Sequence, residues 1–146
     1  MEPTAAKEDY LISTDKNKID LEYVHGFLTH SYWTPGIEKD KVKRGIEGSL
    51  CFGVYQKEQQ VGFARVITDQ ASFAYLCDVF IDEGHRGKGL GKWMVESILA
   101  HPGLQDLRRV MLATRDAHPL YEQCGFTPLN NPDRWMVYSP AENKIK

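Results

Sequence analysis

The sequence predicts a single-domain mixed α/β fold, in which helices cover a sheet that has an antiparallel centre. Three apolar, strand-like runs, at residues 49–55, 61–68 and 73–81, follow one another with only short polar connections between them. Amphipathic helical patterns stand before and after this block, and the strict strand–helix alternation of a doubly wound sheet is absent. Because no linker or internal repeat divides the chain, residues 1–146 are expected to form one domain.

The first third of the chain is predicted to contain a short strand and two helices. The strand is expected at 10–13. Asp20 can then cap an amphipathic helix that begins at Leu21. The segment YWTPG at 32–36 ends that helix, because the residue before a proline avoids helical geometry and glycine favours a turn. A second short helix is expected at 38–47.

The rest of the chain alternates between strand-like and helical patterns. The run at 73–81 is nearly all apolar, as expected of a strand covered on both faces. The elements predicted after it are a glycine-rich loop at 85–92, a helix from about 89 to 100, a strand at 108–114, a short helix from a cap at Asp116 through Tyr121, and strands at 126–129 and 135–138. The predicted order is therefore β-α-α-β-β-β-α-β-α-β-β.

Composition and charge narrow the classes of function. The net charge of −2 gives no overall positive field, so a nucleic-acid-binding protein is disfavoured. The cysteines, at positions 51, 77 and 124, fit no zinc-site spacing, and no metal is expected. The N-terminus has no signal-peptide pattern, and no apolar run is long enough to span a membrane. We therefore expect a reduced, cytoplasmic protein with no membrane partner.

The segment HRGKGLGK at 85–92 is the clearest indication of a binding site, and its spacing excludes two familiar phosphate motifs. A P-loop needs four residues between its glycines and a hydroxyl after the lysine, whereas three residues separate Gly87 from Gly91 and Trp93 follows Lys92. A dinucleotide fingerprint needs a glycine where Lys92 stands, in the first βαβ unit of the chain. Both motifs are therefore excluded.

The pattern that remains is Arg86-x-x-Gly89-x-Gly91, between a buried strand and an amphipathic helix. Glycines allow the backbone to curl until successive N–H groups converge on one anion, and the helix N-terminus adds its dipole. Arg86, Lys88 and Lys92 add positive charge. The loop is therefore predicted to bind an anion, and a glycine-rich connector with a solvated basic rim is the alternative.

Two separate segments resemble motifs of the GCN5-related N-acetyltransferase (GNAT) superfamily. VFIDEGHRGKGLGKWM at 79–94 is similar to the family's strand, R-x-x-G-x-G loop and helix. DAHPLYEQCGF at 116–126 is similar to its A-x-x-x-Y-x-x-x-G-F signature. The order of elements from residue 10 onward fits too, so the resemblance covers most of the chain. It implies a GNAT-like sheet whose central parallel strands splay apart between 79–81 and 111–113.

The resemblance also implies a binding site for acetyl-CoA or coenzyme A. The glycine loop would hold the pyrophosphate through backbone N–H groups, and the end of the preceding strand would pair with the pantetheine arm as an added strand does. The amide of Val79 would face the thioester carbonyl. The residues that the resemblance assigns to the cofactor are Val79, Phe80, Ile81, Arg86, Gly87, Lys88, Gly89, Leu90, Gly91 and Lys92.

Tyr121 matches the tyrosine of the family signature, which implies that it is the general acid for the departing thiolate. Without that motif, Tyr121 would be interpreted as a packing aromatic on a short helix. Many family members have an asparagine seven residues before this tyrosine, whereas this sequence has Thr114. A hydroxyl could replace the amide in a proton relay, and the sequence leaves that question open.

The residues that would bind the acyl acceptor are less well defined. Asp78 is the candidate general base, because a carboxylate within an apolar run is unusual, and alternation places it on the face opposite Val79. An ion pair with Arg65 on the neighbouring strand explains Asp78 equally well. Tyr32 and Trp33 are candidates for covering an apolar or cationic substrate, and packing in the core is the alternative.

The residues and the resemblance together predict an acetyl-CoA-dependent N-acetyltransferase that transfers the acyl group directly to a small-molecule amine in a ternary complex. No covalent nucleophile is placed for the reaction, and the nearest candidate, Cys77, is expected to be a core residue. The alternatives are a non-catalytic sensor of coenzyme A or acyl-CoA, and an enzyme that acetylates protein lysines or N-termini. Because dimers are common in the family, a homodimer is one expected assembly.

Overall fold

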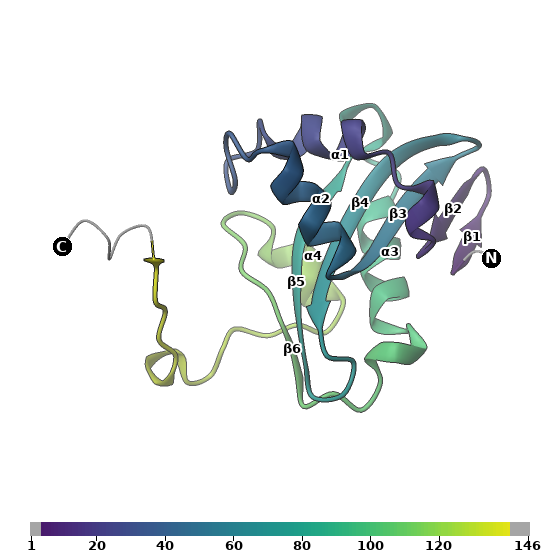
Figure 1. The fold of residues 1–146 in the computed structure, drawn as a ribbon. Helices are drawn as coiled ribbons and strands as arrows, with labels where there is room; N and C mark the ends of the chain where they lie inside the picture. Colours follow the sequence, from purple (N-terminus) through teal and green to yellow (C-terminus); the bar gives the residue numbers. More distant parts are fainter. Residues whose placement is uncertain (1–3, 141–146) are drawn as a thin grey trace.

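The described part of the chain, residues 4–140 of the computed structural model, is built around one mixed sheet (Figure 1). Its strands are β1 (Ala5–Lys7), β2 (Tyr10–Ser13), β3 (Leu50–Gln56), β4 (Gln59–Thr68), β5 (Phe73–Ile81) and β6 (Arg109–Met111). Its α-helices are α1 (Leu21–Leu28), α2 (Lys39–Glu47), α3 (Leu90–Leu99) and α4 (His118–Gln123). Short 3-10 turns lie at Lys16–Lys18, Glu83–His85, Pro102–Leu104 and Pro132–Arg134.

The strands lie across the sheet in chain order, from β1 at one edge to β6 at the other. Neighbours from β1 to β5 are antiparallel, whereas β5 and β6 are parallel. The parallel pair has three residues on each strand, Phe73–Tyr75 and Arg109–Met111. Beyond Tyr75, β5 continues to Ile81 with no described strand on that side. The predicted splay of the central parallel strands is therefore confirmed.

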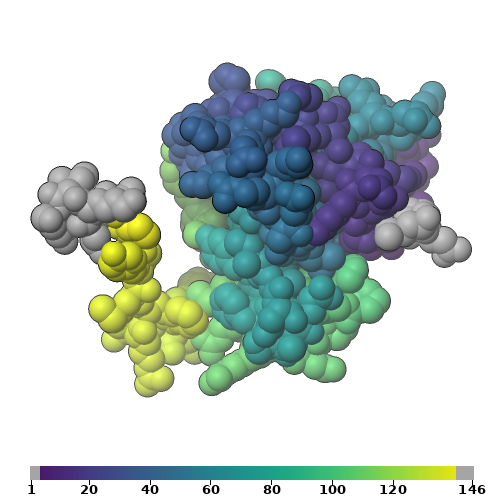
Figure 2. All heavy atoms as spheres, viewed as in Figure 1, coloured from purple at the N-terminus to yellow at the C-terminus, as the bar shows by residue number. Residues whose placement is uncertain are grey.

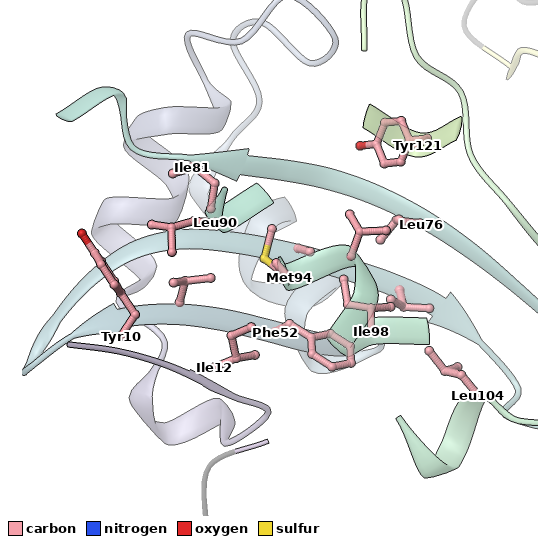
Figure 3. Packing of buried hydrophobic residues seen from close by; sticks show 14 of the residues in the cluster. Tyr10, Ile12, Phe52, Leu76, Ile81, Leu90, Met94, Ile98, Leu104 and Tyr121 are labelled. Carbon is pink, nitrogen blue, oxygen red and sulfur yellow. The ribbon is translucent and has the colours of Figure 1, made fainter. Parts of the chain in front are cut away.

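Helices cover both faces of the sheet (Figure 1). On one face, α1 and α2 enclose a cluster that includes Val24 and Val42 from the helices and Phe63 from the sheet. On the other face, α3 packs its buried side chains, among them Met94 and Ile98, into the larger core (Figure 3). The open side of β5 therefore runs between two layers of packed helices.

A β-bulge interrupts β5 at Asp78. The register with β4 shifts there, so that Ala64 alone lies opposite two residues, Asp78 and Val79. The backbone of Asp78 is left-handed, with φ 54°, a conformation that aspartate tolerates better than most residues. Because of the extra residue, Leu76 and Ile81 face the same core although an odd number of positions separates them.

The C-terminal part of the fold differs from the prediction. The strands expected at 126–129 and 135–138 do not form in residues 4–140, and the strand expected at 108–114 is limited to Arg109–Met111. The last strand is short because β5 diverges from it after three residues. The other two have strand-like sequences but no described strand beside them, and 135–138 projects away from the body of the molecule (Figures 1 and 2).

Two smaller differences concern local structure. β1 was not expected, because its three residues, AAK, have no strand pattern of their own, and pairing with β2 creates it. Asp116 was expected to cap α4, but the cap position belongs to Ala117. Ala117 makes no side-chain cap hydrogen bond to the helix. Its own N–H donates to Oγ1 of Thr114 at 3.0 Å, which holds the turn that leads into α4.

Candidate active site

The loop between β5 and α3 has the shape of an anion cradle. Gly87 and Gly89 have φ angles of 81° and 76°, in the left-handed region. A Cβ atom at either position would meet nothing within 4 Å, so glycine is needed here for its backbone conformation and not for space. Gly89 is the N-cap of α3, and no described side chain caps the first N–H groups of this helix. These groups are therefore available to an anion.

Contacts with the rest of the fold hold two of the basic side chains of the loop, Arg86 and Lys88. Nε of Arg86 donates to the carbonyl oxygen of Ile81 at 3.0 Å, which holds the loop against the end of β5. Nζ of Lys88 donates to the hydroxyl of Tyr10 at 3.1 Å, and the same hydroxyl lies 2.8 Å from Nδ1 of His85. Tyr10, on β2, therefore connects two residues of the loop to an outer strand of the sheet.

Replacing Gly89 with alanine should weaken the binding of coenzyme A about tenfold. The methyl group meets no neighbour, so the cost is the left-handed backbone, about 1 kcal/mol per residue, and the relaxed loop would turn its N–H groups away from the phosphates. Isothermal titration with coenzyme A measures the change. Gly84→Ala, in the same connection but without a positive φ, is the matched control, and equal losses in the two variants would contradict the cradle.

The open edge of β5 leads into this cradle. Val79 is half-buried at the edge, and the side chain of Phe80 turns away to stack on Phe27 with ring centres 3.8 Å apart. The backbone from Val79 to Ile81 can therefore pair with an extended ligand without moving a side chain. The cradle and the edge are therefore adjacent, as a site for an extended ligand with an anionic end requires.

Two partners hold the carboxylate of Asp78. Oδ2 accepts a hydrogen bond from Nε of Arg65 at 2.9 Å, and Oδ1 accepts one from Nε1 of Trp33 at 2.9 Å. The side chains of the ion pair are 22% and 12% exposed, for arginine and aspartate respectively. The sequence allowed Asp78 to be a general base or the ion-pair partner of Arg65, and the structure shows the ion pair. A role of Asp78 as general base stays a prediction.

Tyr32 and Trp33 lie at the surface, with 46% and 40% of their area exposed. Their rings meet edge to face with centres 5.1 Å apart. The guanidinium of Arg115 lies 3.7 Å from the centre of the Tyr32 ring, in a cation–π contact that joins the turn after α1 to the segment before α4. The aromatic pair is therefore outside the core, and it leaves ring surface open to a ligand.

Tyr121 is buried on α4 and packs edge to face against Phe126, with ring centres 5.8 Å apart. Burial, with smaller contributions from Tyr32 and Cys124, raises the pKa of the Tyr121 hydroxyl to about 12. The hydroxyl is therefore protonated at neutral pH. Figure 3 shows it directed along β5 toward the side on which Ile81 lies.

The hydroxyl of Thr114 makes a hydrogen bond in the turn before α4. Its oxygen accepts the hydrogen bond from Ala117, so the residue that stands in place of the family's asparagine is part of a turn. Its own proton can still be donated to a relay. No sequence pattern marks Tyr10 or Arg115 as part of the site, because their partners, His85 and Tyr32, are far away along the chain.

Two histidines, one in α1 and one just after it, make contacts with the backbone. Nε2 of His25 lies 3.0 Å from the carbonyl oxygen of Ile37, and Nδ1 of His30 lies 2.9 Å from that of Gly26. In residues 4–140 no group of three histidine, cysteine or acidic side chains could hold a metal ion. None of the helices described there has the length and apolar character needed to cross a membrane.

Comparisons with known proteins agree with this geometry. Residues 47–128 match the acetyltransferase (GNAT) domain family. The chain is 34% identical over 134 residues to a Gibberella zeae protein named as an acetyltransferase by inference, and the match covers 77% of this chain and 76% of that protein. The chain therefore belongs to the GNAT acetyltransferase family.

Solved structures and a further relative extend this result. A GNAT-family protein from Xanthomonas campestris pv. campestris is 45% identical, with a TM-score of 0.87 over 89% of this chain and 92% of that one. An acetyltransferase from Clostridium acetobutylicum, solved with acetyl-CoA, shares the fold at 14% identity, with a TM-score of 0.65 over 91% and 96% of the two chains. A histone acetyltransferase from Glycine max is 28% identical over 100 residues, which are 68% of this chain and 41% of that protein.

Proposed function

We propose that the protein transfers an acetyl group from acetyl-CoA directly to the amine of a small molecule. The observation that carries the proposal is the continuous path from the glycine cradle along the open edge of β5. Tyr121, as its hydroxyl lies in Figure 3, and the surface aromatic pair formed by Tyr32 and Trp33 complete the site. Membership of the GNAT family supports the same reaction.

Different groups of the chain bind the cofactor, stabilise the negative charge on the thioester oxygen and protonate the sulfur. The N–H groups from Arg86 to Gly91 bind the pyrophosphate, and the backbone at Val79 and Ile81 orients the pantetheine arm. The N–H of Val79 donates to the thioester oxygen as negative charge develops on it. The bond between the amine nitrogen and the carbonyl carbon then forms, the carbon–sulfur bond breaks, and the sulfur takes a proton from Tyr121. The amine releases a proton through solvent, and Tyr121 regains one.

The raised pKa of Tyr121 determines how its hydroxyl can assist the departure of the thiolate. A thiol has a pKa of about 8.5, well below the value of about 12 for this hydroxyl, so complete transfer of its proton to a free thiolate is uphill. The Tyr121 hydroxyl can instead donate a strong hydrogen bond to the sulfur while the carbon–sulfur bond breaks, and this carries no such energetic cost. The transfer is completed when the proton of the amine replaces that of the tyrosine, so the amine must lose its proton in the same turnover.

Direct transfer is favoured over a covalent intermediate on Cys77. Burial raises the pKa of the Cys77 thiol to about 11, so little thiolate is present at neutral pH. We expect Cys77→Ala to retain kcat within about twofold. Steady-state release of coenzyme A measures this, with Cys124→Ala as the matched control. Intact-mass detection of an acetyl group on Cys77 during turnover would contradict direct transfer.

The experiment that tests the proposal has two parts. Isothermal titration with acetyl-CoA, ATP and NAD should show binding of acetyl-CoA alone, and binding of ATP or NAD without it would overturn the assignment of the cradle. Release of coenzyme A is then followed with a panel of small amines, amino acids and lysine peptides. Turnover only with lysine peptides would show that the acceptor is a protein and not a small molecule. Binding without turnover on a broad panel would favour the sensor.

A further inference from the structure

A cavity of about 350 Å³ lies between α2 and the sheet, and it is lined by three basic residues, Lys41, Arg44 and Arg65, and one acidic residue, Asp78. We propose that this basic cavity binds the anionic group of the acceptor, so that the enzyme acetylates amines that also carry a carboxylate or a phosphate group. The inference specifies the acceptor in the proposed function and therefore rests on that function.

Asp78 joins the basic cavity to the proposed site of the reaction. Its side chain lines the cavity, and the next residue of β5 is Val79, whose N–H is assigned to the thioester oxygen in the proposed mechanism. The helices that cover this face of the sheet are α1 and α2 (Figure 1). A small molecule that extends from the cavity past Asp78 therefore has its amine beside the thioester.

The negative charge of Asp78 is already compensated within the fold. Oδ2 accepts from Nε of Arg65 and Oδ1 accepts from Nε1 of Trp33, both at 2.9 Å. A carboxylate held in this way offers little attraction to a further cation. The positive charges of Lys41 and Arg44 therefore determine which ligand the cavity attracts.

These two cations lie on the same helix and differ in their partners. Nε of Arg44 donates to Oδ2 of Asp40 at 3.0 Å, in a pair that is exposed to water and therefore weak. Lys41 takes part in no ion pair within residues 4–140. The cavity thus has an excess of positive charge, although the net charge of the whole chain is −2.

Arg65 keeps a hydrogen-bond donor for a ligand. Its Nε donates to Asp78 and its Nη1 donates to Oγ of Ser49 at 3.1 Å, so the guanidinium is held in place from two sides. In the described chain, Nη2 has no hydrogen-bond partner and is not sealed from solvent. A guanidinium edge of this kind matches the oxygens of a carboxylate or a phosphate.

Gly45, in the middle of α2, gives this guanidinium room. A Cβ atom at position 45 would lie 3.4 Å from Nη1 and 3.5 Å from Cζ of Arg65, so a side chain longer than that of alanine would crowd the guanidinium or fill the cavity. Glycine is unfavourable inside a helix. The space needed above Arg65 explains its presence here.

The size and the remaining lining of the cavity define the rest of the acceptor. A volume of about 350 Å³ is at the small end of the range for small-molecule sites. Apolar side chains, among them Leu28, Val42 and Phe63, form much of the remaining wall. We therefore expect a small acceptor, with a short apolar body between its amine and its anionic group.

Matched pairs of amines test this preference. Release of coenzyme A from acetyl-CoA is measured with butylamine and 4-aminobutanoate, and with ethanolamine and phosphoethanolamine. The anionic member of at least one pair should have a kcat/KM at least about tenfold higher than its neutral partner. The pair with the larger ratio distinguishes a carboxylate from a phosphate. Preference for the neutral member in both pairs would overturn the inference.

The variant Lys41→Gln tests whether the anion lies in the basic cavity. The KM for the preferred anionic amine should rise about fivefold, while kcat and the KM for its neutral partner stay within about twofold. Lys41 is exposed, so the fold should be kept. Lys43→Gln removes the same charge from α2 outside the cavity lining, and it should behave as the unmodified enzyme. Equal KM changes in the two variants would contradict the assignment.

Binding without catalysis separates this inference from the proposed function. Isothermal titration with 4-aminobutanoate and phosphoethanolamine is performed on the unmodified protein and on Lys41→Gln, with coenzyme A present. If no amine is acetylated but an anionic amine binds the unmodified protein about fivefold more tightly, the proposed function fails and the basic cavity stands. If acetylation occurs but both proteins bind the anionic amines equally, the basic cavity is wrong and the proposed function stands. Absence of binding overturns the inference in either case.

Discussion

Replacing Tyr121 with phenylalanine is expected to lower kcat about 100-fold while the KM for acetyl-CoA stays within about twofold. The ring is retained and still packs against Phe126, so the change isolates the hydroxyl. The measurement is steady-state release of coenzyme A with an amine that the unmodified enzyme accepts. Tyr138→Phe, at a tyrosine that is 72% exposed and has no role in the proposed reaction, is the matched control and should keep the kcat of the unmodified enzyme. Equal kcat values in all three proteins would remove Tyr121 from the reaction.

The proposed role of Tyr121 also predicts how kcat depends on pH. Burial disfavours the charged phenolate and so raises the pKa of Tyr121 to about 12. A group that acts in its protonated form loses activity only as the pH rises through its pKa. Ionisation of Tyr121 should therefore cause no fall in kcat up to about pH 10. A falling limb below that pH that is absent from the residual activity of Tyr121→Phe would contradict this assignment.

Replacing Asp78 with alanine is expected to lower the free energy of unfolding by about 3 kcal/mol. The change leaves the guanidinium of Arg65 without its carboxylate and the Nε1 of Trp33 without its acceptor, and it puts alanine in a left-handed conformation. Urea unfolding measures the loss. The exposed ion pair of Asp40 and Arg44 provides the matched control, because Asp40→Ala should cost well under about 1 kcal/mol.

The variant Asp78→Asn separates the two roles open to this residue. Asparagine tolerates the left-handed backbone and can still accept from Trp33, but it cannot serve as a base at neutral pH. If Asp78 positions the bulge and Trp33, the variant should keep kcat within about fivefold and raise the KM for the amine. If Asp78 is the general base, kcat should fall about 100-fold.

Features that depend on neighbouring residues were predictable from the sequence. The cap at Asp20 is present, since its side chain accepts from the N–H of Tyr23 at 3.1 Å. The three-strand meander and the glycine loop also stand where the patterns placed them, because hydrophobic alternation and glycine spacing are local properties. Asp78 could be singled out for the same reason, as a charge in an apolar run.

Features that depend on the meeting of distant segments were not predictable. The bulge at Asp78 is a property of the pairing of β5 with β4, and no single strand carries its signal. The contact between Tyr10 and His85 joins residues 75 positions apart. Residues 135–138 have the composition of a strand, but a strand forms only beside another strand. The described part of the chain places no strand beside them, so the prediction was wrong.

The contact of Tyr10 with Lys88 has a practical consequence for protein engineering. Because this hydroxyl accepts a hydrogen bond from a basic residue of the cradle, the hairpin of β1 and β2 supports a loop that lies 78 positions later in the chain. An affinity tag or fusion partner joined close to Ala5 would press on the hairpin that positions Lys88. Labels for fluorescence or surface immobilisation are better placed on the exposed face of α2, away from Lys41 and Arg44, and the buried residues of this helix, Val42 and Ile46, lie on its other side.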